Sequence, residues 1–394
     1  MDLADSATEA AFRAEARVFL EGNIHLAPSD LADPAGEWEQ GLAARKQWQR
    51  VLYDNGWAAI TWPAHHGGRG LGPVEQIIWN QECVRARAPS SISIVGIGMA
   101  GPALIEHGTD DQRERYLSKI LSGEEIWCQL FSEPDAGSDL ASVTTRAERD
   151  GDGWVVNGQK VWSSGAHFSQ RAILLARTDA TVPKHKGLTF FVLDMQSPGV
   201  TVRPLRQMNG GAHFNEVFLD QVRIPDTCLV GEPGEGWRVA TTTLLHERMT
   251  LGGSLGLFHM EDLIDLARKH QPLPAHVRDL VARAYTYERC LEYLNARIMS
   301  KLSAGEIPTA EGSITKLAVT RMLSTAADSA LAILGSSSLT EPGPWIDLFL
   351  VNPGIRIGGG TDNIQKNMAA ERVLGLPREA DESRELPFNQ VRHS

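Results

Sequence analysis

Two neighbouring stretches in the first half of the chain decide how the rest is organised. Residues 127–139 read WCQLFSEPDAGSD, and residues 154–166 read WVVNGQKVWSSGA. Pro134 and Gly137 interrupt any helix in the first stretch, so its hydroxyls and backbone N–H groups are free to face a ligand. In the second stretch, Asn157–Gly158 favours a two-residue type I′ turn, which predicts a β-hairpin. A polar loop beside a hairpin is well suited to hold a flat, polar, aromatic ring.

Helical patterns dominate the chain before these stretches. Apolar residues recur at helical spacing between Ala7 and Gly123, and Asn55–Gly56 marks a helix end within that range. The segment Ser91–Gly101 alternates Ile with Gly and Ser. It permits either close helix packing or the wall of a narrow tunnel. We therefore predict an all-α N-terminal domain over residues 1–124.

The apolar period changes to two in the middle of the chain, over residues 125–232. Short strands are predicted at Trp154–Asn157, Gln159–Ser163, Arg171–Arg177, Leu188–Asp194, Val200–Leu205 and Glu216–Ile224. Strands this numerous, with few helices between them, indicate an antiparallel β-barrel or sandwich as the middle domain.

Helical periodicity returns in residues 233–394. Helices are predicted over Trp237–Lys269, Pro274–Ala304 and Thr309–Leu334. Long antiparallel helices joined by short loops form a bundle, so the third domain is expected to be an all-α helical bundle.

Composition limits the possible partners. The 394 residues carry a net charge of −11, which argues against nucleic acid or an anionic membrane as a partner. The four cysteines are far apart, as reduced cytoplasmic thiols would be, and the histidines lack metal-ligand spacing. With neither a secretory signal pattern nor an apolar run long enough to span a membrane, we expect a cytoplasmic protein without a metal site.

The two opening stretches carry a resemblance to a known family. The pattern Phe-Ser-Glu-Pro-x-Ala-Gly-Ser-Asp, followed by Asn-Gly-x-Lys-x-Trp-x-Ser, closely resembles the flavin-binding signature of the acyl-CoA dehydrogenases. The likeness runs from the segment at Trp62 to Pro377. It implies FAD as cofactor and α,β-dehydrogenation of an acyl-CoA thioester to trans-2-enoyl-CoA, as in fatty acid β-oxidation and lipid metabolism. Electrons would pass to an electron-transfer flavoprotein.

The resemblance also implies which residues meet the cofactor and substrate. Those expected at the flavin and its phosphates are Phe131, Ser132, Gly137, Ser138, Trp162, Ser164, Thr361 and Asn363. Those expected at the acyl-CoA are Ser138, Arg248 and Gly360.

The general base is the residue on which the mechanism depends. Many relatives carry it as the Glu of a Tyr-Glu-Gly-Thr segment, but the matching position here is Gly359. A minority carry it on the helix that opens the C-terminal domain, immediately before an Arg, and this dipeptide is Glu247-Arg248 here. We predict that Glu247 removes the α-proton while flavin N5 accepts the β-hydride. A Glu-Arg pair on an ordinary amphipathic helix would instead face solvent. Three glycines follow closely, as expected where backbone approaches another helix or a ligand: Gly252, Gly253 and Gly256.

Two departures from the family pattern leave alternatives open. In relatives, two segments contact the adenylate of a neighbouring subunit's FAD. The matching segments here are Ala267–Pro274 and Ala332–Ser336, and both lack the expected motifs. The chain is therefore expected to form either a homotetramer or a heterotetramer with a homologous chain. A non-catalytic or half-site partner subunit, and an oxidase or flavin monooxygenase of the same fold, are the alternative functions.

Overall fold

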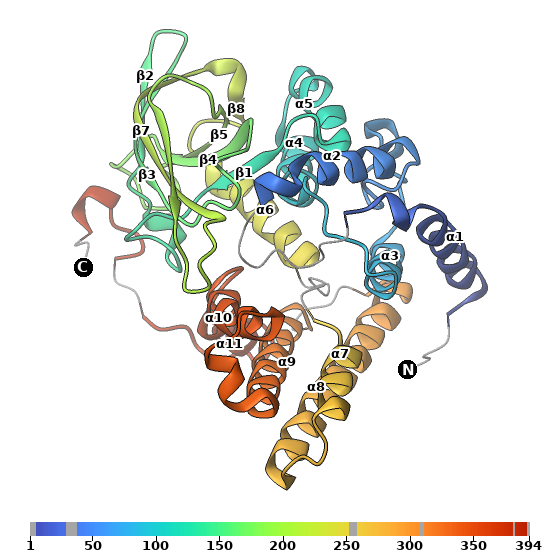
Figure 1. Cartoon of the computed structure of the whole chain (residues 1–394). Coiled ribbons are helices and arrows are strands. Elements are labelled where there is room, and N and C mark those ends of the chain that lie inside the picture. The colour runs from blue at the N-terminus through green and yellow to red at the C-terminus, as the bar shows by residue number, and fades with distance from the viewer. Residues whose placement is uncertain (1–4, 29–37, 252–257, 307–310, 381–382, 392–394) are drawn as a thin grey trace.

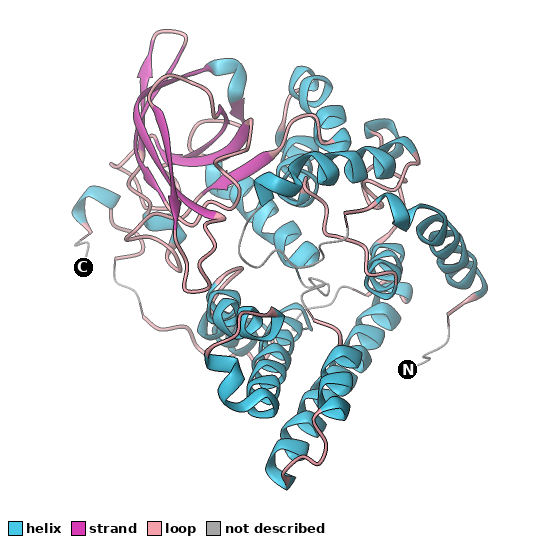
Figure 2. Ribbon diagram, viewed as in Figure 1, coloured by secondary structure: helices cyan, strands magenta, loops and turns pink. Residues whose placement is uncertain are grey.

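The computed structural model describes residues 5–28, 38–251, 258–306, 311–380 and 383–391. Helices come first, strands occupy the middle of the chain, and helices return after it (Figure 1). Figure 2 shows the strands gathered into one body, with helices beside and below it. The predicted fold class, a β domain between two helical domains, is confirmed.

The N-terminal helices are α1 (Ala7–Asn23), α2 (Trp38–Asp54), α3 (Pro73–Arg85), α4 (Gly101–His107) and α5 (Asp110–Ser122). Side-chain caps define the starts of α1 and α5. Ser6 and Glu9 form a capping box at the start of α1, and Thr109 and Gln112 form one at the start of α5. Helix α5 ends at Gly123, whose φ of 72° is the left-handed conformation that glycine adopts readily.

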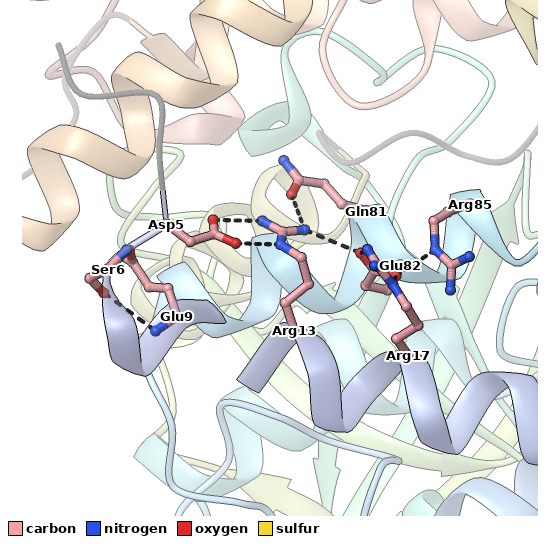
Figure 3. Close-up of polar contacts among 8 residues, drawn as sticks. All are labelled: Asp5, Ser6, Glu9, Arg13, Arg17, Gln81, Glu82 and Arg85. Atoms are coloured by element: carbon pink, nitrogen blue, oxygen red, sulfur yellow. Dashed lines mark hydrogen bonds and ion pairs between the residues drawn. The ribbon is translucent and has the colours of Figure 1, made fainter. Parts of the chain in front are cut away.

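A buried carboxylate joins α1 to α3 (Figure 3). Glu82 of α3 is 2% exposed and accepts hydrogen bonds from Arg17 at 2.9 Å and Arg85 at 2.6 Å, with Arg13 at 3.4 Å. Burial alone would raise the pKa of Glu82, but Arg17 and Arg85 outweigh it and lower that pKa to about 2. The carboxylate is therefore charged throughout the neutral range.

The glycines of the Ser91–Gly101 segment allow close packing. A short π-helical turn, Gly96–Ala100, leads directly into α4. A Cβ on Gly101 would lie 1.9 Å from the indole of Trp62, and one on Gly96 would lie 2.8 Å from Ile120. Of the two interpretations of this segment, close packing is the one that the structure supports.

The middle of the chain forms one sheet of eight strands in the order β6-β7-β3-β2-β4-β5-β8, with β1 paired to β4. The strands are β1 (Trp127–Leu130), β2 (Arg146–Asp150), β3 (Gly153–Lys160), β4 (Arg171–Arg177), β5 (Leu188–Asp194), β6 (Val200–Leu205), β7 (Phe214–Pro225) and β8 (Leu229–Val230). The predicted antiparallel sheet is observed for most strand pairs, but β1 and β2 both pair with β4 in parallel. The long connection from β1 to β4 allows that direction.

The predicted hairpin at Asn157–Gly158 is also wrong. Both residues lie inside β3, which runs unbroken from Gly153 to Lys160 and carries a bulge against β7 at this point. A Cβ on Gly158 would lie 2.3 Å from Thr145, so glycine serves close strand packing here rather than a turn. The hairpin turn lies instead between β2 and β3, around Gly151.

Both faces of the sheet are buried along β4. Along β4, Ile173 and Leu175 pack against the helices, whereas Ala172, Leu174 and Ala176 belong to a second apolar cluster. The first cluster joins β1, β4 and β5 to α4, α5 and the next helix, α6 (Gly236–Leu251). This shared core fixes α6 against the sheet.

The remaining helices are α7 (Met260–Lys269), α8 (Ala275–Ser303), α9 (Glu311–Leu334), α10 (Pro344–Ile357) and α11 (Asp362–Arg372). The single helix predicted over Trp237–Lys269 is wrong, because His259 has extended backbone immediately before α7 begins. Residues 252–257, with all three glycines of that region, lie outside the described residues. Helix α9, extended to Ser338, is long and apolar enough to cross a membrane, but half of its apolar window is buried, as in a core helix.

Candidate active site

A buried ion pair supports the polar loop that follows β1. Lys160, at the end of β3, is fully buried, and its ammonium donates to Glu133 at 2.8 Å and to the carbonyl of Phe131 at 2.9 Å. Glu133 also accepts the backbone N–H groups of Thr144 at 2.7 Å and Thr145 at 2.9 Å. The pair thus ties both ends of the loop to β3.

Charge compensation keeps the Glu133 carboxylate ionised. Burial alone would raise the pKa of Glu133, but the charge and hydrogen bond of Lys160, with the bonds from Thr145 and Thr144, hold that pKa below its usual range. A buried carboxylate without these partners would be costly to keep charged. The carboxylate that supports the loop is therefore kept charged.

A buried arginine holds the far end of the same loop. Arg177 of β4 donates to the carbonyls of Ala141 at 2.6 Å and Val143 at 3.0 Å, and its guanidinium lies 3.5 Å from the ring centre of Phe388. Burial lowers the pKa of Arg177 to about 10. The polypeptide from Phe131 to Thr145 is therefore anchored at both ends.

Three of the predicted cofactor residues flank the tight turn in this loop. Glu133 and Ala136 bond to each other across a tight turn, which leaves Gly137 and Ser138 exposed and Ser132 half-buried. A Cβ on Gly137 would meet no atom within 4 Å. Phe131 by contrast is buried, with its ring edge-on to that of Phe190.

Trp162 is presented on strained backbone just after β3. Its φ of 62° is uncommon for a bulky residue, and such strain is concentrated at functional sites. The indole is 60% exposed and packs edge-on against Phe214. Ser164 is exposed beside it, and the N–H of Val161 donates to the carbonyl of Ser132 at 2.9 Å. The structure thus brings together the loop and the Trp162 segment.

Glu247 lies on the buried face of α6. Ala240, Thr243 and Glu247 follow one another at helical spacing, and Glu247 is only 8% exposed. Its Oε2 accepts a hydrogen bond from the amide of Gln129 at 3.4 Å. Gln129 lies on β1, two residues before Phe131. The carboxylate therefore faces the strand that leads into the loop and does not face solvent.

The cofactor residues expected in the C-terminal domain lie at the start of α11. The Thr361 side chain caps α11 by accepting from the N–H of Ile364 at 3.1 Å, and Asn363 is exposed in the first turn. Gly359 and Gly360 precede them with φ values of 62° and 88°. In the described part of the chain, no hydrogen bond joins these residues to the loop. The backbone of Arg248 belongs to α6, but its side chain lies outside the described residues.

An ionic network fixes the turn before α11. Asp362 bonds to Arg356 of α10 at 2.8 Å and to Lys316 of α9 at 3.4 Å. Burial alone would raise the pKa of Asp362, but these two cations hold it below its usual range. The glycine turn is consequently tied to two other helices.

Sequence reasoning missed the residues that support the site. Gln129, Glu133 and Lys160 were not among the predicted site residues, although Gln129 and Lys160 are polar residues in stretches that otherwise favour strands. Lys160 stands between Gly-Gln and Val-Trp in a predicted strand. A lysine in such a place suggests a buried ion pair, because a buried ammonium requires a partner. Its partner cannot be identified without the fold.

Models of one family match nearly the whole chain. Those described as the N-terminal, middle and C-terminal domains of acyl-CoA dehydrogenase match residues 6–124, 128–222 and 234–374. The acyl-CoA dehydrogenase IpdE1 of Mycobacterium tuberculosis is 40% identical over 383 residues, covering 94% of this chain and 98% of the relative.

Solved structures agree with this match. The Tcur3481-Tcur3483 steroid ACAD superposes with a TM-score of 0.85 at 30% identity, covering 96% of this chain and 100% of that one. The ChsE4-ChsE5 complex from M. tuberculosis gives a TM-score of 0.81 at 26% identity, covering 96% and 100%. The chain therefore belongs to the acyl-CoA dehydrogenase family.

Proposed function

We propose that this chain is an FAD-dependent dehydrogenase of acyl-CoA thioesters in which Glu247 is the general base. The single observation that carries the proposal is the position of Glu247, buried on α6 and in contact with Gln129 of β1. A carboxylate on a solvent-facing helix surface could not meet a bound thioester. A carboxylate that faces the strand leading to the polar loop can meet a bound thioester.

The chemistry requires a base in a dry site. The α-proton of a thioester is weakly acidic, and a carboxylate removed from water is a stronger base than one that is solvated. Glu247 would take the α-proton, and the product would be a trans-2-enoyl-CoA. Bound FAD would supply the two-electron acceptor, and an electron-transfer flavoprotein is the proposed next carrier.

The residues present fit a flavin. The exposed indole of Trp162 offers a flat apolar surface, while Ser138 and Ser164 are exposed hydroxyl donors. The open space around Gly137 admits close approach to backbone. We propose that these residues, with Phe131 and Ser132, hold the cofactor, and that Thr361 and Asn363 contribute from α11.

For the acyl group, we propose a bulky, ring-bearing chain of steroid type. One structural relative at 30% identity is described as a steroid ACAD, which favours this class over the straight chains of fatty acid β-oxidation. Gly359 supports the same choice, because no side chain occupies the position of the alternative base. Ser138, Arg248 and Gly360 remain the proposed contacts to the thioester.

We also propose that the chain works in the cytoplasm as part of an oligomer with identical or homologous chains. Two structural relatives, the Tcur3481-Tcur3483 steroid ACAD and the ChsE4-ChsE5 complex, are each named for a pair of chains. All four cysteines are free thiols, as in a reducing compartment. Large apolar side chains are exposed on and after the last two helices, and they are Phe349, Ile357, Val373, Leu374 and Leu376.

Anaerobic bleaching of the bound flavin by a panel of acyl-CoA thioesters tests the proposed function. We expect the purified protein to be yellow and a steroid-type thioester to bleach it faster than straight-chain thioesters of similar length. Preference for a straight chain would reject the substrate class alone. A colourless protein would indicate a partner subunit, and rapid peroxide formation in air would indicate an oxidase.

A further inference from the structure

The side chain of Gln129 lies on the helix-facing side of β1. Its neighbours in the strand alternate, with Trp127 and Phe131 in the apolar cluster shared with α4, α5 and α6, and Cys128 and Leu130 in the cluster on the other face. Gln129 therefore projects with Trp127 and Phe131. A polar amide in this position interrupts an apolar surface and is expected to have a specific partner.

That partner is Glu247. The Nε2 of Gln129 donates to Oε2 of Glu247 at 3.4 Å. The backbones of both residues are held firmly, because Gln129 pairs with Ile173 of β4 and α6 packs against β4 and β5. The contact is thus between two rigid elements, not between mobile loops.

We propose that Gln129 is a positioning residue that holds the Glu247 carboxylate in its ionised, substrate-ready orientation. This inference rests on the proposed role of Glu247 as base. An amide is suited to the task because it donates a hydrogen bond without carrying a charge and does not titrate. A lysine or arginine here would pair with the carboxylate strongly enough to weaken it as a base.

The hydrogen bond opposes the effect of burial. Removal from water disfavours the charged form of a carboxylate, whereas a donated hydrogen bond favours it. Without the amide, ionisation of Glu247 needs a higher pH. The acidic limb of the pH–rate profile should then move upward, and the lost rate should return as the pH is raised. A purely structural role for Gln129 would not produce this recovery.

Among the described titratable groups on α6 and the elements beside it, two histidines stay neutral and two arginines have partners of their own. Burial lowers the pKa of His107 on α4 and of His246 on α6, with Glu106 opposing both shifts, so neither ring gains charge near neutral pH. Arg171 pairs with Glu125 and Asp194, and Arg177 bonds to loop carbonyls. Arg248 is next to Glu247 on α6 and is unchanged in the variants compared below. The titration of Glu247 can therefore be followed by comparing variants that differ only at Gln129.

The test compares Gln129→Met with Gln159→Met. Gln159 of β3 also donates to a glutamate, Glu216 of β7 at 3.0 Å, but lies on a different part of the sheet, and so provides a matched control. The limiting rate of anaerobic flavin bleaching is measured against pH with the best thioester of the panel. For Gln129→Met we expect a rate about three- to tenfold lower at pH 7 and an acidic limb raised by roughly half to one pH unit.

Flavin content and the half-saturating thioester concentration should remain near wild type in Gln129→Met, and Gln159→Met should match wild type throughout. Wild-type pH profiles for Gln129→Met, alongside an inactive Glu247→Gln, would overturn the positioning role and leave the proposed function standing. Wild-type rates for Glu247→Gln would instead reject the proposed function.

A second variant decides the matter if Gln129→Met does not hold flavin. Gln129→Glu preserves the size of the side chain and places a second carboxylate against Glu247, so that the two titrate as a pair. The acidic limb should rise further than the Met substitution is expected to raise it. An unchanged limb in this variant also contradicts the proposal.

Discussion

At the scale of single residues, the best-defined feature of the site is the buried pair of Lys160 and Glu133. Their side chains are 0% and 5% exposed, and both bond to backbone of the polar loop. Removing one member of such a pair leaves an unpaired buried charge, whereas removing both charges is far less costly.

Lys160→Met is therefore expected to destabilise the fold by about 3–5 kcal/mol and to reduce flavin retention. Urea unfolding and the ratio of flavin to protein absorbance measure the two effects. The double variant Lys160→Met/Glu133→Gln should recover much of the stability, because the Gln amide oxygen can still accept from Thr144. Equal instability of the single and double variants would show that the charge of Glu133 is not the cause.

The sequence predicted the residues of this site unevenly. The family resemblance, with Gly359 at the usual position of the base, implies Glu247 as the candidate base, and the structure buries that side chain. Gln129 could not be predicted, because its partner is 118 residues away along the chain. Only the packing of α6 on the sheet brings the two together.

At the scale of elements, regular strands were predicted well and irregular ones were not. The bounds of β4, β5 and β6 agree with the predicted ranges, because each has β-favouring residues between clear turn formers. The predicted turn at Asn157–Gly158 is wrong because Gly158 packs closely against Thr145 inside a strand, where a Cβ would not fit. The strand β2 was not predicted, since four of its five residues are charged and only Ala147 is buried.

The contact between α1 and α3 gives a prediction about pH. Glu82 has a pKa of about 2 in the fold against an ordinary value of 4.5, so its stabilisation is fully present above about pH 4.5 and is lost as the pH falls toward 2. Glu82→Gln should cost roughly 3 kcal/mol at pH 7 and much less at pH 3. Urea unfolding at both pH values measures the difference. Glu21→Gln, at an exposed partner of Arg85, should have little effect, and an equal loss at both pH values would refute the assignment.

The close approach of α4 to Trp62 gives a second element-level prediction. Ala normally stabilises a helix relative to Gly, and Gly22→Ala on α1, where a Cβ meets nothing within 4 Å, should raise stability by up to about 1 kcal/mol. Gly101→Ala should instead destabilise by about 1–3 kcal/mol or more, because its Cβ meets the indole. Thermal unfolding of the two variants tests this, and a stabilised Gly101→Ala would contradict the packing described.

At the scale of the whole molecule, the apolar side chains exposed on and after the last two helices need an explanation. Leu374 is 72% exposed, and Leu376 and Ile357 are 53% and 65% exposed. Such a group of apolar residues often marks an interface between chains. The proposed oligomer would cover it.

We expect Leu374→Asp/Leu376→Asp to lower the mass measured by light scattering while helical content is retained. Val18→Asp is a matched control, since Val18 on α1 is also 72% exposed, and it should leave the mass unchanged. A wild-type chain that stays monomeric at every concentration, alone and with a co-expressed homologous chain, would contradict the proposed assembly.

The central claim is that the buried carboxylate of Glu247 removes the α-proton. Its most direct test is the rate of anaerobic flavin bleaching in Glu247→Gln, measured with the thioester that bleaches wild type fastest. Gln has the shape of Glu without its basicity, so we predict full flavin content, retained thioester binding and a rate lower by about 10²–10⁴-fold. A rate within a few fold of wild type would show that the base lies elsewhere.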